Sequence, residues 1–297
     1  MSAKSAVIKL NNGLEMPMLG LGVYEASPEE TVSATRAAIS AGYRLIDTAK
    51  AYRNEAQVGE GLRMSGIDRS ELFVTTKLFN CDYGYDSALR GFDESLQKLG
   101  LEYLDLYLLH WPTQNWQATL QSWKALERLL SEKRVRSIGV CNFLEGHLDM
   151  LLSETQIVPV INQIELHPYF NQKSLIRKNK DLGIVTEAWS PIGGVKNYGS
   201  WDQYGGAKDP LAEQAIIAIG QAHGKTPAQI ILRWHIQNGV VAIPKSTNAE
   251  RIAQNIDIFD FALTAQQMAQ IDALEAGMRA GPHPKDVDTD SFAEHVR

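Results

Sequence analysis

The sequence predicts an α/β fold, a (β/α)8 TIM barrel with an N-terminal β-hairpin cap and an extra C-terminal helix and tail. Eight short β-rich segments alternate with longer helical patterns, as in repeated βα units around a parallel sheet. The chain has 297 residues, a length that one barrel often reaches. No proline-rich or low-complexity linker interrupts it. Residues 1–297 are therefore expected to form a single domain.

Short β-rich runs predict the hairpin and then the strands. Residues 7–10 and 14–18 flank the turn Asn11-Asn12-Gly13, so they are predicted to pair as the N-terminal hairpin. Each later run is bounded by turn residues or by a helical pattern. The eight barrel strands are predicted at residues 19–22, 44–48, 72–78, 104–110, 135–140, 159–166, 183–189 and 240–244.

Helices are predicted in the gaps between these strands, and three of them carry start signals. Residues 27–30 (Ser-Pro-Glu-Glu) combine an N-cap serine, a proline in the first turn and a capping-box glutamate, and Gly42 marks the end of that helix. Thr226-Pro227 repeats the cap and the proline. Thr264 with Gln267 repeats the capping box, at the start of the extra C-terminal helix.

An open doubly wound sheet is the alternative arrangement of alternating strands and helices. Such a sheet binds dinucleotides through a GxGxxG turn after its first strand, but Gly20-Leu21-Gly22 is followed here by Val-Tyr-Glu. The barrel is therefore favoured. Two segments, residues 190–210 and the tail 277–297, exceed ordinary loop lengths and are expected to be functional or mobile.

The net charge and the number of cysteines indicate which binding partners and which cellular compartment to expect. The formal net charge of −6 offers no basic footprint for a polyanion, so nucleic acid is not expected as a partner. Cys81 and Cys141 are too few for a disulfide framework, which favours a reducing, cytoplasmic location. No signal peptide and no run of ~18 apolar residues is present, so no membrane contact is expected. We expect a monomer acting on a small molecule.

Polar residues end seven of the predicted strands. In a parallel barrel the C-terminal strand ends form one rim, where active sites lie. Each such residue alone is explained as readily by helix capping, core packing or contact with solvent. An Asp, a Lys and a His from consecutive strands favour a site, because buried ionisable groups are costly unless paired. The strand-end residues are Asp47, Thr48, Lys77, His110, Cys141, Asn142, Trp189, Ser190, Lys245 and Ser246, together with Asn162 and Gln163 inside the sixth strand.

Four residues at this rim can carry acid–base chemistry. Asp47 and Lys77 are suited to a buried ion pair, and Tyr52 follows Asp47 at the same rim. A phenol has a pKa of about 10, and the ammonium of Lys77 is expected to lower that pKa by favouring the phenolate. His110, if neutral, can hydrogen-bond a substrate oxygen or relay a proton to the phenol. This set suits protonation of a carbonyl oxygen while a separate carrier brings hydride to the carbon.

Two other reaction classes have weaker support. A metal-dependent barrel hydrolase or isomerase needs clustered ligands, but the seven histidines show no HExxH and no clustered acidic spacing, so no metal is expected. A Ser-His-Asp hydrolase would carry a GxSxG elbow, which this sequence lacks.

From about residue 6 to residue 276 the chain resembles the aldo-keto reductases, NADPH-dependent (β/α)8 barrels that interconvert carbonyls and alcohols. The most specific pieces are GYRLIDTAKAYRNEAQVGEGL, FVTTKL, DLYLLHWP, SIGVCNF, NQIELHP and IPKSTNAERIAQN. The resemblance implies that Asp47, Tyr52, Lys77 and His110 are the catalytic residues. These are the same four residues that the strand ends indicate.

The resemblance also implies a site for NADP(H). Asn142 and Gln163 would bind the nicotinamide carboxamide beside Cys141, and Trp189 would stack on the nicotinamide ring. Cationic donors suit a 2′-phosphate, and the guanidinium of Arg251 adds bidentate geometry, so NADP(H) is expected over NAD(H). The other implied contacts are Ser190, Pro191, Ile192 and Gly193 at the pyrophosphate, Lys245, Ser246 and Thr247 at the 2′-phosphate, and Gln254 and Asn255 at the adenine.

Four positions depart from the family pattern or alter the site. Cys141 stands where serine is usual, Thr247 where valine is common, and Tyr24 where many members have tryptophan. Lys50 is expected to place a charge close to Tyr52. These departures are expected to retune the cofactor contacts and the shape of the pocket.

Tyr24, Trp111 and Trp116, with the tail, are expected to wall an aromatic cleft for an apolar or polycyclic ligand. Trp116 could equally begin the core face of the next helix. The runs FNCDYGYDSALR and HWPTQNW resemble family members of the morphine 6-dehydrogenase type, which implies NADP-linked oxidation of an alkaloid alcohol, or ketone reduction in reverse. A sugar ketoacid reductase, of the 2,5-diketogluconate type, is the alternative. A second alternative is a cofactor-sensing regulatory subunit, but the presence of all four catalytic residues disfavours it.

Overall fold

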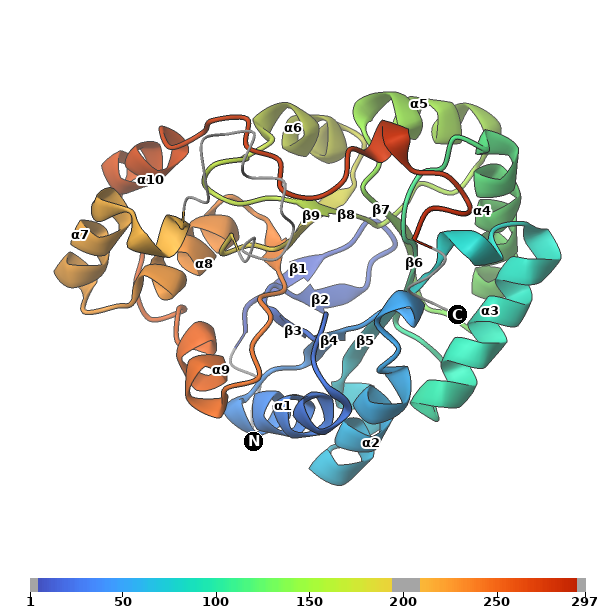
Figure 1. Cartoon of the computed structure of the whole chain (residues 1–297), viewed down its shortest axis with the longest axis horizontal. Helices are drawn as coiled ribbons and strands as arrows, with labels where there is room; N and C mark the ends of the chain where they lie inside the picture. Colours follow the sequence, from blue (N-terminus) through green and yellow to red (C-terminus); the bar gives the residue numbers. More distant parts are fainter. Residues whose placement is uncertain (1–4, 194–208, 293–297) are drawn as a thin grey trace.

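The computed structural model describes residues 5–193 and 209–292. Eight parallel strands form one sheet, and helices surround it (Figure 1). The fold is the (β/α)8 barrel that the sequence predicts. The strands are β3 (Gly20–Gly22), β4 (Leu45–Asp47), β5 (Phe73–Leu78), β6 (Leu106–Leu109), β7 (Ile138–Cys141), β8 (Ile161–Glu165), β9 (Val185–Trp189) and β10 (Val241–Ala242).

The strands follow one another around the sheet in chain order, from β3 to β10. The first strand also meets the last: the backbone N–H of Gly22 donates to the carbonyl of Pro244 at 3.1 Å, and that of Ala242 donates to Met18 at 3.0 Å. These bonds close the barrel. A Cβ at Gly22 would lie 2.8 Å from the Ile243 carbonyl oxygen, so glycine is needed for β3 to approach this closely.

Helices fill the connections, and their caps follow the sequence signals. Ser27 and Glu30 form a capping box at the start of α1, and Gly42 ends that helix in the left-handed conformation (φ 105°). Capping boxes also begin α8 and α10. The helices are α1 (Pro28–Ala41), α2 (Glu55–Ser65), α3 (Tyr85–Leu99), α4 (Trp116–Ser131), α5 (Glu145–Glu154), α6 (Lys173–Asp181), α7 (Gln214–His223), α8 (Pro227–Gln237), α9 (Ala249–Ile256) and α10 (Ala265–Asp272).

The N-terminal hairpin closes one end of the barrel. Strands β1 (Val7–Lys9) and β2 (Glu15–Pro17) pair antiparallel and cross the centre of the ring in Figure 1. Leu10 and Met16 of the hairpin are buried against side chains of the barrel interior such as Leu106. Removing this apolar surface from water stabilises the closed end. The cavity described below opens at the opposite rim.

The segment after α10 runs over the rim (Figure 1, red). The backbone N–H of Ala280 donates to Glu165 at the end of β8, and the backbone N–H of Gln114, just before α4, donates to the carbonyl of Val287. A short 3-10 helix, Pro284–Asp286, lies within this segment. Of the two long loops that the sequence predicts, residues 194–208 and 293–297 lie outside the described residues. No helix in the described ranges has the length and apolarity to cross a bilayer.

Candidate active site

Four ionisable or polar side chains meet at the open rim, as the sequence predicts. Asp47 ends β4, Lys77 is the penultimate residue of β5, and His110 follows β6 directly. Tyr52 ends the short 3-10 helix Lys50–Tyr52 that follows β4. Parallel strands in register bring their C-terminal ends to one edge, which is why residues up to 63 positions apart gather in one place.

Lys77 lies at the centre of this group. Its Nζ is 2.5 Å from Oδ1 of Asp47, 2.9 Å from the carbonyl oxygen of Thr48 and 3.4 Å from the phenol oxygen of Tyr52. Asp47 and Lys77 are both fully buried. Burial by itself lowers the pKa of Lys77, but the charge of Asp47 raises it above its usual value, so the side chain is an ammonium at neutral pH.

The pKa of Tyr52 differs from the sequence expectation. Burial raises this pKa above 10, and the opposing effect of Lys77 does not cancel the rise. The expected net lowering of the Tyr52 pKa is therefore wrong for the protein without ligands, because the desolvation of a phenolate at this position outweighs the effect of an ammonium 3.4 Å away. The phenol is protonated at neutral pH, and Lys77 is placed to stabilise the phenolate after a proton has left.

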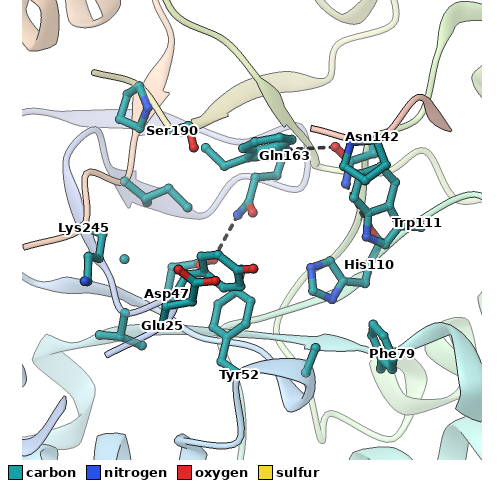
Figure 2. A pocket seen from close by; sticks show the side chains of 18 of the residues that line it. Glu25, Asp47, Tyr52, Phe79, His110, Trp111, Asn142, Gln163, Ser190 and Lys245 are labelled. Carbon is teal, nitrogen blue, oxygen red and sulfur yellow. Dashed lines mark hydrogen bonds between the residues drawn. The ribbon is translucent and has the colours of Figure 1, made fainter. Parts of the chain in front are cut away.

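His110 is neutral in this site. Burial, and to a lesser extent the charge of Lys77, holds the pKa of His110 well below its usual range. The imidazole contacts the ring of Tyr52, with centroids 5.9 Å apart, and Phe79 at 5.8 Å. Figure 2 shows it beside Tyr52 and Trp111 at the edge of the cavity. A neutral imidazole can donate or accept one hydrogen bond at a ligand oxygen.

Lys50 has a different role from the one expected. Its ammonium pairs with Asp82 at 2.6 Å and with Glu94 at 2.8 Å. The charge of Lys50 therefore faces Asp82, in the connection between β5 and α3, and Glu94 on α3. These ion pairs tie the short helix that carries Tyr52 to the adjacent unit of the barrel.

A cavity of about 410 Å³ opens above the four residues. Asp47, Tyr52 and His110 line it, and Lys77 lies behind them. Aromatic side chains form part of its walls. Trp116 is not among the lining residues, because it begins α4 and packs against Phe143. The aromatic lining residues are Tyr24, Tyr52, Phe79, Trp111, Trp189 and Phe292.

One wall of the cavity carries amides. Gln163 on β8 donates through Nε2 to Oδ2 of Asp47 at 2.9 Å (Figure 2). Asn142, just after β7, accepts from the indole N–H of Trp189 at 2.8 Å and donates to the carbonyl of His110 at 3.0 Å. Asn142 (φ 62°) and Ser190 (φ 48°) both adopt the left-handed conformation at their strand ends. Such strained positions often belong to binding sites.

A second cavity adjoins the first, and Ile192 and Lys245 line both. Arg251 also lines it, on α9, whose N-terminus is capped by the Asn248 side chain. Together the two cavities present the amides of Asn142 and Gln163 in the first and the cationic side chains of Lys245 and Arg251 in the second. Of the residues implied for the cofactor, Cys141 packs in the barrel interior and Gly193 lines neither cavity. The residues implied for the cofactor in this second cavity are Ile192, Lys245, Ser246, Thr247, Arg251, Gln254 and Asn255.

Two buried glutamates near the site escaped the sequence argument. Glu187 in β9 accepts from Nε2 of Gln163 at 2.8 Å. Glu165 at the end of β8 accepts from the backbone N–H groups of Ala280 and Gly281. The runs TEAW and IELHP gave one signal, a glutamate in a predicted strand, but the sequence argument selected Asn162, Gln163 and Trp189 from these two strands and passed over the glutamates.

The comparisons with known proteins agree with this fold. Residues 17–276 match the model of the aldo/keto reductase family. The chain therefore belongs to the aldo/keto reductase family, and it is an oxidoreductase.

Three relatives illustrate the similarity. The chain is 66% identical to morphine 6-dehydrogenase of Pseudomonas putida, over 100% of both chains. It is 44% identical to methylglyoxal reductase DkgA of Escherichia coli, over 95% of this chain and 98% of the relative. The aldo-keto reductase of Bombyx mori, solved in complex with NADP, matches with a TM-score of 0.88 at 38% identity, over 97% of this chain and 99% of that chain.

Proposed function

We propose that this chain uses NADP(H) to interconvert a ketone or aldehyde with the corresponding alcohol, and that Tyr52 is the general acid in reduction and the general base in oxidation. The observation that carries the proposal is the phenol oxygen of Tyr52, 3.4 Å from Lys77 Nζ, in a cavity that continues into a second cavity with cationic walls. An acid beside a stabilising cation, next to a second cavity that carries Lys245 and Arg251, suits carbonyl reduction with a phosphate-bearing cofactor.

Each of the four residues has a distinct role. Tyr52 gives its proton to the carbonyl oxygen, and the ammonium of Lys77 stabilises the phenolate that remains. Asp47, 2.5 Å from Lys77, keeps the lysine charged and in place. His110, neutral beside Tyr52, holds the substrate oxygen by a hydrogen bond and so orients the carbonyl.

The cofactor residues form two groups. Gln163, Asn142 and Trp189 would hold the nicotinamide end, and Lys245 with Arg251 would hold the 2′-phosphate. The cofactor supplies the hydride that the protein cannot. The indole N–H of Trp189 now occupies Oδ1 of Asn142, so a carboxamide that binds there must replace this bond. The NADP in the Bombyx mori relative supports this choice of cofactor.

The substrate that we propose is an alkaloid alcohol of the kind that morphine 6-dehydrogenase oxidises, or the corresponding ketone. The 66% identity to that enzyme supports this choice. The cavity supports it as well, because Tyr24, Trp111 and Phe292 offer flat apolar faces to a polycyclic ligand. Among the described residues that line this cavity, Lys245 is the one cation, and it also faces the second cavity. A sugar ketoacid would need a cation for its carboxylate.

Steady-state kinetics with purified protein test this function. The change in absorbance of NADPH is followed with morphine and NADP⁺ in one direction, and with polycyclic ketones and 2,5-diketogluconate in the other. We expect kcat/KM to be highest for the polycyclic compounds. A higher kcat/KM for diketogluconate would establish the sugar ketoacid alternative. NADPH binding without turnover of any substrate would indicate a cofactor-sensing subunit.

We also propose that the protein works as a monomer in the cytoplasm. The large apolar side chains that are exposed in the described part of the chain, Val7, Met64 and Met150, lie singly on β1, α2 and α5. The sequence has two cysteines, Cys81 and Cys141, too few for a disulfide framework, which suits a reducing compartment. Light scattering after size-exclusion chromatography should give a mass near 33.0 kDa.

A further inference from the structure

A buried glutamate lies below the cavity and outside the four residues of the proposed mechanism. Glu187 is the third residue of β9, between Thr186 and Ala188, and it is completely buried. Its Oε2 accepts a hydrogen bond from Nε2 of Gln163 at 2.8 Å. Its Oε1 is buried and makes no hydrogen bond within the described residues. Burying a carboxyl group costs free energy when one of its oxygens has no hydrogen-bond partner, so the presence of Glu187 at this position needs an explanation.

The partner of Glu187 is an amide that has two carboxyl neighbours. Nε2 of Gln163 donates to Glu187 at 2.8 Å and to Oδ2 of Asp47 at 2.9 Å. An amide nitrogen has two N–H groups and accepts nothing, so these two bonds use its full capacity. With the amide rotated by 180°, its oxygen would face the charge of Asp47, which is unfavourable. The two carboxyl groups therefore fix which way the amide of Gln163 points.

This orientation matters because Gln163 lines the cavity. With Nε2 held toward the barrel interior, Oε1 is left as an acceptor on the cavity side. We infer that Glu187 is a positioning residue that holds the amide of Gln163 so that its oxygen accepts an N–H from the carboxamide of a nicotinamide cofactor. This inference rests on the proposed function, since it assumes that the cavity binds the nicotinamide.

The protonation state of Glu187 is compatible with this role. Burial, with a further contribution from the charge of Asp47, raises the pKa of Glu187 to about 8. The side chain is therefore a neutral acid at pH 7, and the oxygen without the proton can still accept from Gln163. The other ionisable groups that act on the pKa of Glu187 are Asp47 and Lys77, which form the ion pair. Because Glu187 is neutral, it adds no charge next to the ion pair of Asp47 and Lys77.

Two substitutions separate the hydrogen bond from the volume of the side chain. Glu187→Gln keeps a neutral acceptor for Gln163. Glu187→Met keeps a similar length and volume but has no comparable acceptor, so the amide of Gln163 is held only by Asp47. Glu187→Val, which suits a strand, provides the same comparison if the methionine variant does not fold.

Cofactor binding is measured without turnover, by quenching of tryptophan fluorescence. The ligands are NADP⁺ and its 3-acetylpyridine analogue, in which a methyl ketone replaces the carboxamide and so removes the N–H donor. One hydrogen bond of this kind corresponds to about 3- to 10-fold in Kd. We expect wild type and Glu187→Gln to prefer NADP⁺ by this factor, and Glu187→Met to prefer it by less than about twofold.

Three results would overturn the inference. The first is a folded Glu187→Met or Glu187→Val variant that prefers NADP⁺ over the 3-acetylpyridine analogue as strongly as wild type does. The second is a Glu187→Gln variant that has lost this preference. The third is a wild type that binds both ligands equally, which leaves the proposed function intact. A wild type that does not bind NADP⁺ at all overturns the proposed function, and this inference with it.

Discussion

The phenol oxygen of Tyr52, which lines the cavity, lies 3.4 Å from the ammonium nitrogen of Lys77, which is fully buried. Desolvation keeps the phenol protonated, and the nearby cation makes loss of the proton less costly at the moment of transfer.

The first prediction concerns the proton donor. Tyr52→Phe removes the hydroxyl and keeps the ring that packs against Tyr24 and His110. We expect kcat to fall by about 10²- to 10⁴-fold, the usual contribution of a general acid, while the Kd of NADPH stays within about twofold. Stopped-flow absorbance and fluorescence titration measure the two quantities. An unchanged kcat would refute the proposed role.

The second prediction concerns the buried ion pair. Asp47→Asn leaves the ammonium of Lys77 buried without its counter-charge, which typically costs about 3–5 kcal/mol of stability. We expect a lower Tm and a lower kcat. The double variant Asp47→Asn/Lys77→Met should regain part of the Tm, because it buries no unpaired charge. Equal Tm values for the single variant and wild type would show that the pair contributes little.

The third prediction concerns cofactor choice. Arg251→Ala removes a guanidinium from the second cavity. We expect KM for NADPH to rise by about 10- to 100-fold, as for a lost charged hydrogen bond, and KM for NADH to change little. Arg128→Ala, an exposed arginine on α4, is the matched control and should leave both values unchanged. A ratio of the two KM values that does not change in Arg251→Ala would contradict the assignment.

The fourth prediction is a pH dependence of stability. The folded chain holds a proton on Glu187 up to about pH 8, whereas an unfolded glutamate releases it near 4.5. Between these values the folded state binds one more proton, so this group makes the free energy of unfolding fall by about 1.4 kcal/mol per pH unit as pH rises.

Glu187→Gln carries no titrating proton at this position and should flatten that slope. Urea unfolding at pH 5, 6, 7 and 8 measures it. Glu60→Gln, on the exposed face of α2, serves as the control and should keep the wild-type slope. A wild type whose stability rises across this range, with the same rise in Glu187→Gln, would mean that Glu187 is ionised in the folded protein.

The fifth prediction concerns the segment that covers the rim. Glu165 accepts from the backbone N–H groups of Ala280 at 2.6 Å and Gly281 at 3.0 Å, and a Cβ at Gly281 would collide with the ring of Trp189. Glu165→Gln removes the negative charge and one of the two acceptors, so residues 279–282 should exchange amide hydrogen faster. We also expect KM for a polycyclic substrate to rise by about fivefold or more, because Pro282 and Phe292 line the cavity. Unchanged exchange would contradict the anchoring role of Glu165.

Local patterns predicted the elements well because they depend on neighbours in sequence. The capping boxes at Ser27, Thr226 and Thr264 all form, since a side chain and an N–H three residues away need no distant partner. Strand limits were less accurate. The last predicted strand, residues 240–244, is reduced to Val241–Ala242, because pairing with β9 decides where a strand ends.

The sequence by itself determined the barrel, the rim and the four residues that meet there, because strand order and register bring the strand ends together. Only the tertiary structure decided the contacts and the burial of each side chain. It turned Lys50 toward Asp82 and Glu94, placed Trp116 against Phe143, and set Glu187 under Gln163. It also raised the pKa of Tyr52, because desolvation depends on every atom packed around a group, and sequence spacing does not report that packing.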